Sequence, residues 1–235
     1  MSKLFVTGTD TGIGKTVVMT LLTEALTEEI GPVFPYKPIE TGVKEEGERT
    51  DVETYQFVMD PVQLEHRTYA FSEPYSPHFA ARLEKKSIDI VRIQQDIANI
   101  EAQYEGVLIE GAGGLFVPLQ EKGPYIIDLI KTLQTPVILV ASTTLGTINH
   151  TLLSILALKK YHIPIVGLLF NLYDIERETE LDNIRLIERE TKLPIIGTVP
   201  KRENIVAELQ TKEGREGLRN DWKVDYCLPY LRRKE

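Results

Sequence analysis

The sequence predicts an α/β fold with a mostly parallel central sheet and helices on both faces. Short apolar runs, typical of strands that are buried on both faces, recur along the chain. Longer segments with apolar residues three or four positions apart lie between these runs. Strands that alternate with helices form βαβ units, in which a crossover helix joins two parallel strands.

Six apolar runs are the expected strands. Each has four to six residues, apolar on consecutive positions and bounded by glycine or proline. In a parallel sheet ligands bind at the carboxyl ends of the strands, so residues that follow these runs are candidates for a functional site. The runs are Leu4–Thr7, Val33–Tyr36, Val107–Glu110, Val137–Ala141, Ile165–Phe170 and Ile195–Val199.

Four longer segments are expected to be amphipathic helices, and a shorter helix is expected to start at Ser76-Pro77. Serine is a favoured N-cap, and proline fits the first helical position. The charged segment Lys44–Arg49 is expected to be a solvated turn, whereas the pattern after Leu209 predicts no particular element. The four longer segments are Thr16–Glu29, Ser87–Tyr104, Ile148–Tyr161 and Arg177–Thr191.

Residues 1–235 are expected to form one domain, because no linker rich in Ser, Gly or Pro divides the chain. The 42% apolar and 26% charged residues are ordinary for a globular protein. A net charge of −8 and a pI near 5.2 argue against nucleic-acid binding. The apolar runs are far shorter than the ~20 residues of a membrane-spanning helix, and no secretory signal is expected. Cys227 has no partner for a disulfide, which fits a cytoplasmic protein.

The strongest functional signal lies between the first expected strand and the first expected helix. A phosphate-binding loop reads Gly, four residues, Gly-Lys and Ser or Thr. Here the first glycine stands one position early, so the loop is one residue longer. Glycines let backbone N–H groups turn toward a phosphate, the helix adds its dipole, Lys15 reaches the terminal phosphates and Thr16 binds Mg²⁺. The segment, which predicts a phosphate-loop NTPase-like fold, is Gly8-Thr9-Asp10-Thr11-Gly12-Ile13-Gly14-Lys15-Thr16.

A lysine and two acids follow later strands. Lys37 comes directly after the second expected strand, and we expect it to face the phosphate loop together with Thr41. Glu110 ends the third expected strand, across from Thr16 as a ligand of Mg²⁺, and the glycines after it are typical of a close approach to a ligand. Asp51 has two interpretations at this point, a helix N-cap or a further Mg²⁺ ligand.

Asn171 follows the fifth expected strand, where GTPases read guanine with Asn-Lys-x-Asp. Leu172 stands in place of the lysine, so guanine selectivity is not expected. Asn171 remains either a contact to a base edge or an ordinary loop residue. The four histidines are widely spaced and Cys227 has no partner thiol, so the sequence predicts no zinc site.

Together these motifs resemble those of the dethiobiotin synthase family. The resemblance spans positions 6–150, with weaker matches at Asn171 and Gly197-Thr198-Val199-Pro200. It includes the phosphate loop with its additional residue. The matching stretches are 6–16, Lys37-Pro38-Ile39-Glu40-Thr41-Gly42, Ser76-Pro77-His78, Glu110-Gly111-Ala112-Gly113-Gly114 and Leu145-Gly146-Thr147-Ile148-Asn149-His150.

The resemblance implies an enzyme that converts 7,8-diaminononanoate, CO₂ and ATP into dethiobiotin, ADP and phosphate in biotin synthesis. One substrate amine takes up CO₂ as a carbamate, whose oxygen attacks the γ-phosphate of ATP. The second amine then attacks the mixed anhydride, closes the ureido ring and expels phosphate. The resemblance also implies Mg²⁺, a homodimer with the substrate site near the subunit interface, and no nucleic-acid or membrane partner.

The resemblance further implies roles for individual residues. Lys37, Lys15 and Thr11 are implied in catalysis, and Thr16, Asp51 and Glu110 in Mg²⁺ binding. Thr41, Gly111 and Asn149 are implied substrate contacts, with the helix that begins at 145–149 in the partner subunit receiving the substrate carboxylate. The implied nucleotide contacts are Gly12, Ile13, Gly14, Lys15, Thr16, Val17, Asp51, Glu110, Gly111, Ala112, Gly113, Asn171, Leu172, Pro200, Lys201 and Arg202.

The sequence matches three other functions less well than it matches dethiobiotin synthesis. A partner-regulated ATPase of the cell-division or plasmid-partition type would need an additional lysine early in the loop, and positions 9–13 contain none. A GTPase-type switch is disfavoured by Leu172. A glutamine-dependent amidotransferase would need a cysteine-containing glutaminase domain, for which 235 residues with Cys227 alone leave no room.

Overall fold

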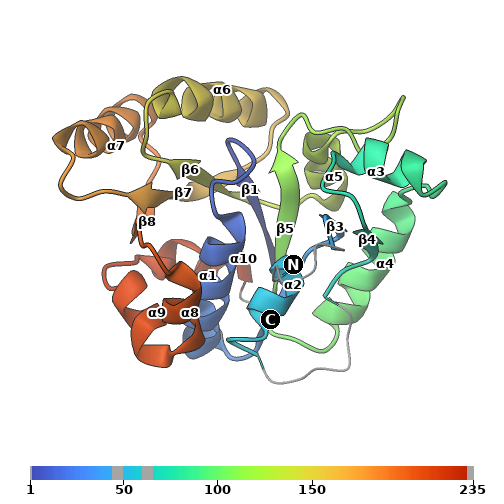
Figure 1. The fold of residues 1–235 in the computed structure, drawn as a ribbon, viewed down its shortest axis with the longest axis horizontal. Helices are drawn as coiled ribbons and strands as arrows, with labels where there is room; N and C mark the ends of the chain where they lie inside the picture. The colour runs from blue at the N-terminus through green and yellow to red at the C-terminus, as the bar shows by residue number, and fades with distance from the viewer. Residues whose placement is uncertain (1, 44–49, 60–65, 232–235) are drawn as a thin grey trace.

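A six-stranded sheet forms the centre of the molecule (Figure 1). A computed structural model describes residues 2–43, 50–59 and 66–231. All neighbouring strands pair in parallel, in the order β2-β5-β1-β6-β7-β8, which confirms the predicted fold class. The strands are β1 (Lys3–Gly8), β2 (Val33–Tyr36), β5 (Gly106–Gly114), β6 (Val137–Ser142), β7 (Ile165–Tyr173) and β8 (Ile195–Pro200).

Hydrophobic cores lie on both faces of this sheet, because successive strand residues point to opposite sides. On β1, Phe5 packs with the helices of one face, whereas Leu4 and Val6 pack with those of the other. Figure 1 shows α6 and α7 on one side of the sheet and α1, α8 and α9 on the other. The first group is α4 (Ile90–Glu101), α5 (Ile126–Leu133), α6 (Thr147–Lys160) and α7 (Glu178–Thr191); the second is α1 (Lys15–Ile30), α8 (Ile205–Gln210), α9 (Lys212–Leu218) and α10 (Leu228–Leu231).

The predicted long helices are all present, with shifted ends. The largest shift is in α4, predicted over Ser87–Tyr104, which begins only at Ile90 because Asp89 caps it by accepting a hydrogen bond from the backbone N–H of Val91. Helix α5 was not predicted, although it is strongly apolar on one face. Strand β5 is longer than predicted and includes the glycines expected to follow it.

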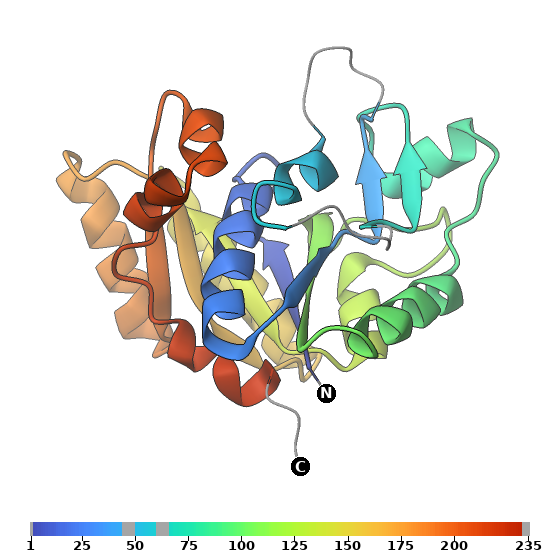
Figure 2. The same ribbon diagram turned by 90° about the horizontal axis from the view of Figure 1, so that it is seen from below.

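A second, two-stranded sheet lies beside the main one (Figure 2). It consists of β3 (Ile39–Thr41) and β4 (Tyr69–Phe71), next to α3 (Pro77–Leu83). Helix α3 begins at Pro77 as predicted, but the Ser76 side chain makes no capping bond and lies 3.0 Å from His78 Nδ1 instead. Helix α2 (Asp51–Tyr55) lies against α1, and the predicted turn Lys44–Arg49 is outside the described residues.

The chain after Leu209, for which the sequence predicted no element, packs against α1. It forms α9, a 3₁₀ turn (Val224–Tyr226) and α10, with Leu218 and Leu231 in the core below α1. Arg215 is buried and forms an ion pair with Glu24 of α1 at 2.7 Å, and its guanidinium also donates to the Leu209 carbonyl at 2.7 Å. This contact joins segments 191 residues apart, a distance that no local pattern reveals.

Arg215→Ala is expected to lower the free energy of unfolding by about 3 kcal/mol, because it removes the shorter of the two ion pairs of the half-buried Glu24 and leaves only Arg219, at 3.3 Å. Lys212→Ala on the same helix is the matched control. Lys212 makes an exposed ion pair with Glu216 at 3.7 Å, and its loss should cost no more than about 0.5 kcal/mol. Urea unfolding curves of both variants measure the difference, and equal midpoints would contradict it.

None of the helices within the described residues is both long and apolar enough to cross a membrane.

Candidate active site

The phosphate loop connects the carboxyl end of β1 to α1. Gly12 and Gly14 have φ angles of +73° and +77°, in the left-handed region that side chains disfavour, and Gly14 is the N-cap of α1. The Lys15 ammonium donates to the carbonyl of Asp10 at 3.0 Å, so the lysine folds back over its own loop. These conformations leave the loop backbone and the start of α1 facing a cavity, as a phosphate site requires.

The side chain of Asn171 contacts the backbone of this loop. It lies in β7, so its interpretation as an ordinary loop residue is wrong. Its amide Nδ2 donates to the carbonyl of Ile13 at 2.8 Å and lies near that of Gly14 at 3.4 Å. A Cβ atom on Gly14 would meet this Nδ2 at 1.9 Å, so the glycine is required by the neighbouring amide as well as by its φ angle.

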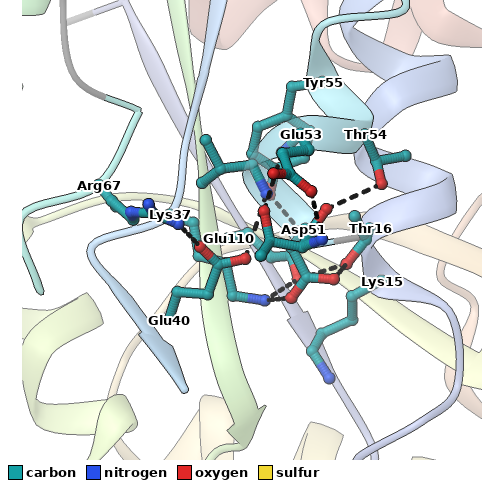
Figure 3. Close-up of polar contacts among 12 residues, drawn as sticks. Lys15, Thr16, Lys37, Glu40, Asp51, Glu53, Thr54, Tyr55, Arg67 and Glu110 are labelled. Atoms are coloured by element: carbon teal, nitrogen blue, oxygen red, sulfur yellow. Dashed lines mark hydrogen bonds and ion pairs between the residues drawn. The ribbon is translucent and has the colours of Figure 1, made fainter. Parts of the chain in front are cut away.

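Four polar side chains converge just beyond the end of β2, beside Glu110 in the middle of β5 (Figure 3). We call Thr16, Lys37, Asp51 and Glu110 the Lys37 cluster. The Lys37 ammonium donates to Asp51 Oδ2, and to Glu110 Oε1 at 2.9 Å. The Thr16 hydroxyl lies 2.6 Å from Asp51 Oδ1 and 3.1 Å from Glu110 Oε1. The parallel sheet thus places residues from four segments of the chain at one point.

Asp51 is the first residue of α2 and not its N-cap. Thr50 is the N-cap and forms a capping box with Glu53. Because the capping is done by its neighbour, the Asp51 carboxylate is available to the Lys37 cluster. The N-cap interpretation of Asp51 is therefore wrong.

Burial and charge oppose each other in the Lys37 cluster. Burial by itself lowers the pKa of Lys37, but the charges of Glu110 and Asp51 outweigh it, so that pKa lies above its usual value. Burial likewise raises the pKa of Asp51, and the nearby Lys37 more than reverses this effect. Burial, aided by the charge of Lys37, lowers the pKa of Lys15. Lys37 and Asp51 are thus held in their charged forms at neutral pH.

The oxygen atoms of the Lys37 cluster fit a magnesium ion. Mg²⁺ prefers hard oxygen ligands and is usually held by one or two carboxylates together with substrate phosphates and water. Thr16 Oγ1 lies within hydrogen-bond distance of both carboxylates, so three oxygen-bearing groups converge. Among the described residues, no group of three or more acidic, histidine or cysteine side chains is placed to hold a metal ion.

All six predicted catalytic and metal-binding residues line one cavity of about 480 Å³. Thr11, Lys15 and Lys37 face it together with Thr41, as the motifs predicted. Val206 and Leu209 of α8 close one side, which the sequence did not predict. The lining residues are Thr11, Gly12, Gly14, Lys15, Thr16, Val17, Lys37, Ile39, Thr41, Asp51, Thr54, Pro74, Glu110, Ala112, Gly113, Val206 and Leu209.

Other predicted contacts lie outside this cavity lining. Gly111 is buried within β5, where an added Cβ would lie 2.8 Å from Phe5, so its lack of a side chain serves strand packing. Ile13 is buried in the core, and Asn149 is exposed on the first turn of α6. Their roles in binding stay predictions, as do those of Leu172 at the end of β7, Pro200 at the end of β8, and Lys201 and Arg202 beyond it.

Three buried or half-buried residues around the Lys37 cluster were given no role from the sequence. Tyr55 on α2 donates to Glu110 Oε2 at 2.5 Å. Glu40 on β3 is buried, accepts from the backbone N–H of Val52 at 3.2 Å and forms an ion pair with Arg67. Tyr55 stands four positions after Asp51, the spacing that places two side chains on one helix face, and this was the available signal.

Comparisons with known proteins identify the family. A family model described as an AAA domain matches residues 2–209. The ATP-dependent dethiobiotin synthetase of Halalkalibacterium halodurans is 41% identical over 223 residues, which cover 93% of this chain and 92% of that protein. The chain belongs to the dethiobiotin synthetase family. The ATP-dependent dethiobiotin synthetase of Bacillus subtilis strain 168 is 36% identical, over 88% of this chain and 91% of that protein.

Solved structures show that the fold of this dethiobiotin synthetase family member is shared more widely. A putative plasmid partition protein of Borrelia burgdorferi, bound to AMPPNP, matches 97% of the chain with a TM-score of 0.59 at 12% identity. The MinC:MinD cell division complex of Aquifex aeolicus includes a chain with a TM-score of 0.55 at 15% identity, over 91% of this chain and 86% of that chain. At such identities the likeness concerns the fold alone.

Proposed function

We propose that this protein makes dethiobiotin from 7,8-diaminononanoate, CO₂ and ATP, as a single domain of residues 1–235. The observation that carries the proposal is the single cavity in which the phosphate loop meets the Lys37 cluster. Nucleotide-binding residues, Lys15 at the start of α1 and Lys37 after the end of β2 face the same space, as a phosphoryl transfer to a bound anion requires. Family membership supplies the substrates.

The two lysines have complementary places in the proposed reaction. Negative charge spreads over the transferring phosphoryl group, and preorganised cations stabilise it. Lys15 belongs to the phosphate loop, whereas Lys37 comes from the end of β2 and suits the carbamate oxygen that attacks the γ-phosphate. Thr11 lines the same cavity, and its hydroxyl lies 3.2 Å from the position of a Cβ atom on Gly113. The second amine then displaces phosphate as the ureido ring closes.

We also propose that Thr16, Asp51 and Glu110 hold Mg²⁺ together with phosphate oxygens of ATP. The ion, when bound, would supply positive charge to the β- and γ-phosphates. The residues themselves keep the ligand oxygens close together before binding. Lys37 offsets part of the negative charge of the two carboxylates, which would otherwise repel a polyphosphate more strongly.

Exposed apolar residues support the homodimer in which the substrate site would be completed. Leu145 is fully exposed, and Leu153 and Leu156 of α6 are more than half exposed, as is Phe116. Phe116 and Leu153 line a second cavity of about 320 Å³ beside Thr11. A partner subunit that covers this surface would remove apolar area from water and place the start of its α6 near the substrate. We propose a cytoplasmic location on the basis of the family and the unpaired Cys227.

The test is a reaction of the purified protein with MgATP, bicarbonate and 7,8-diaminononanoate. We expect dethiobiotin, identified by mass spectrometry, and phosphate in equal amounts, with phosphate release that depends on the diamine. The control reaction omits the diamine and keeps every other component. Phosphate release at the same rate without diamine would contradict the proposed reaction and would favour the partition-type ATPase.

A further inference from the structure

The two oxygens of the Glu110 carboxylate face different partners. Oε1 lies 3.1 Å from the Thr16 hydroxyl and 2.9 Å from the Lys37 ammonium, on the side of the phosphate loop. Oε2 accepts a hydrogen bond from Tyr55 at 2.5 Å. Glu110 is buried, so water does not take the place of either partner. The phenol therefore engages the oxygen that points away from Thr16.

Tyr55 is held firmly in this place. Its side chain is fully buried in the core between α1 and the sheet, and its ring lies 6.0 Å from that of His66. From this position the hydroxyl donates its hydrogen bond to Glu110 Oε2.

Tyr55 and Asp51 both reach the Lys37 cluster from helix α2. They are four positions apart, so both side chains lie on the same face of the helix. The helix is fixed at its start by the Thr50–Glu53 capping box and by Glu40, which accepts from the N–H of Val52. Figure 3 shows Asp51 and Tyr55 projecting from α2 toward Glu110. One short helix thus supplies one carboxylate of the cluster and the donor that restrains the other.

We propose that Tyr55 is a positioning residue that fixes the rotation of the Glu110 carboxylate, so that Oε1 faces Thr16 and the metal ion. This inference rests on the proposed Mg²⁺ site. Hydrogen bonds to a ligating carboxylate are known to set metal affinity, and their loss typically weakens it about 10- to 100-fold. Without the phenol the carboxylate loses the hydrogen bond that restrains Oε2, and only the contacts of Oε1 with Lys37 and Thr16 oppose its rotation.

The test measures Mn²⁺ binding to the protein with the non-hydrolysable nucleotide AMPPNP, by electron paramagnetic resonance of free Mn²⁺. Tyr55→Phe removes only the hydroxyl, and we expect the dissociation constant of Mn²⁺ to rise about tenfold. The matched control is Tyr36→Phe. Tyr36 is also fully buried, but it lies in the core on the other face of the sheet from Tyr55, and its hydroxyl contacts Thr68. The Mn²⁺ affinity of this variant should therefore not change.

A double-mutant cycle shows whether Tyr55 acts through Glu110. In a Glu110→Gln background, Tyr55→Phe should change the Mn²⁺ dissociation constant less than about twofold. An unchanged dissociation constant in the single variant Tyr55→Phe would overturn the inference, as would an equal loss in both backgrounds. A wild-type protein that binds no Mn²⁺ with AMPPNP would instead overturn the metal site of the proposed function.

Discussion

Lys37→Ala is expected to lower the turnover number at least about a hundredfold, the usual loss for one preorganised charge in an active site. Lys37 is buried, and its ammonium contacts Asp51 and Glu110 at the cavity wall. The variant removes the cation proposed for the carbamate and the transferring phosphoryl group. It also leaves two carboxylates close together without a counterion, which opposes the approach of a polyphosphate.

The measurement is steady-state phosphate release with saturating MgATP, bicarbonate and diamine, together with thermal unfolding of each protein. Lys37→Arg is the conservative comparison, since it keeps the charge but changes its geometry. Lys3→Ala removes another largely buried lysine, which pairs with Glu101 at 3.0 Å and does not line the cavity, and should leave turnover near that of the wild type. Near-normal turnover of Lys37→Ala would show that this lysine is not part of the catalytic machinery.

Gly14→Ala is expected to lower the affinity for ATP by at least about tenfold, through two effects on the phosphate loop. A non-glycine residue at φ +77° costs about 1 kcal/mol or more in backbone strain. The added Cβ would also stand 1.9 Å from Asn171 Nδ2, so the amide must leave and the carbonyl of Ile13 loses its donor. The loop backbone then no longer presents its N–H groups in the preformed arrangement.

Isothermal titration with AMPPNP and Mg²⁺ measures this loss of affinity. Gly31→Ala is the matched control, because Gly31 has φ +91° at the end of α1, far from the cavity, and meets only Glu105 at 3.4 Å. It should lose stability and keep its nucleotide affinity. The double variant Gly14→Ala/Asn171→Ala should regain part of the affinity, because the clashing amide is gone. Equal affinities of wild type and Gly14→Ala would show that Asn171 does not hold the loop.

The fold and the site differ in how far local sequence predicts them. The strands are apolar on consecutive residues because both of their faces are buried, and that signal needs no knowledge of the partner strand. The chain after Leu209 has no such pattern, because its few core residues, such as Leu218 and Leu231, are separated by exposed turns. Its attachment depends on Arg215 meeting Glu24, a contact that only the folded chain creates.

The alternatives left open for Asp51 and Asn171 also show that local sequence does not reveal which partner a side chain takes in the folded protein. Asp51 fits an N-cap equally well by residue type, and the capping box of Thr50 decides against it. Asn171 fits a base contact, and in the folded protein its amide is bonded to the carbonyl of Ile13. For Asp51 the neighbouring Thr50 takes the capping role, whereas for Asn171 the fold adds a contact with the phosphate loop and its base contact stays a prediction.

The sequence by itself determined the parallel α/β fold, the phosphate loop and the family, because these depend on periodicity and on short motifs with fixed spacing. The tertiary structure alone decided that Lys37 and Tyr55 donate to different oxygens of the Glu110 carboxylate. Hydrogen bonds of this kind form between residues tens of positions apart, after the parallel strands have brought their carboxyl ends to one edge of the sheet. Their directions depend on that packing, and no stretch of sequence encodes them locally.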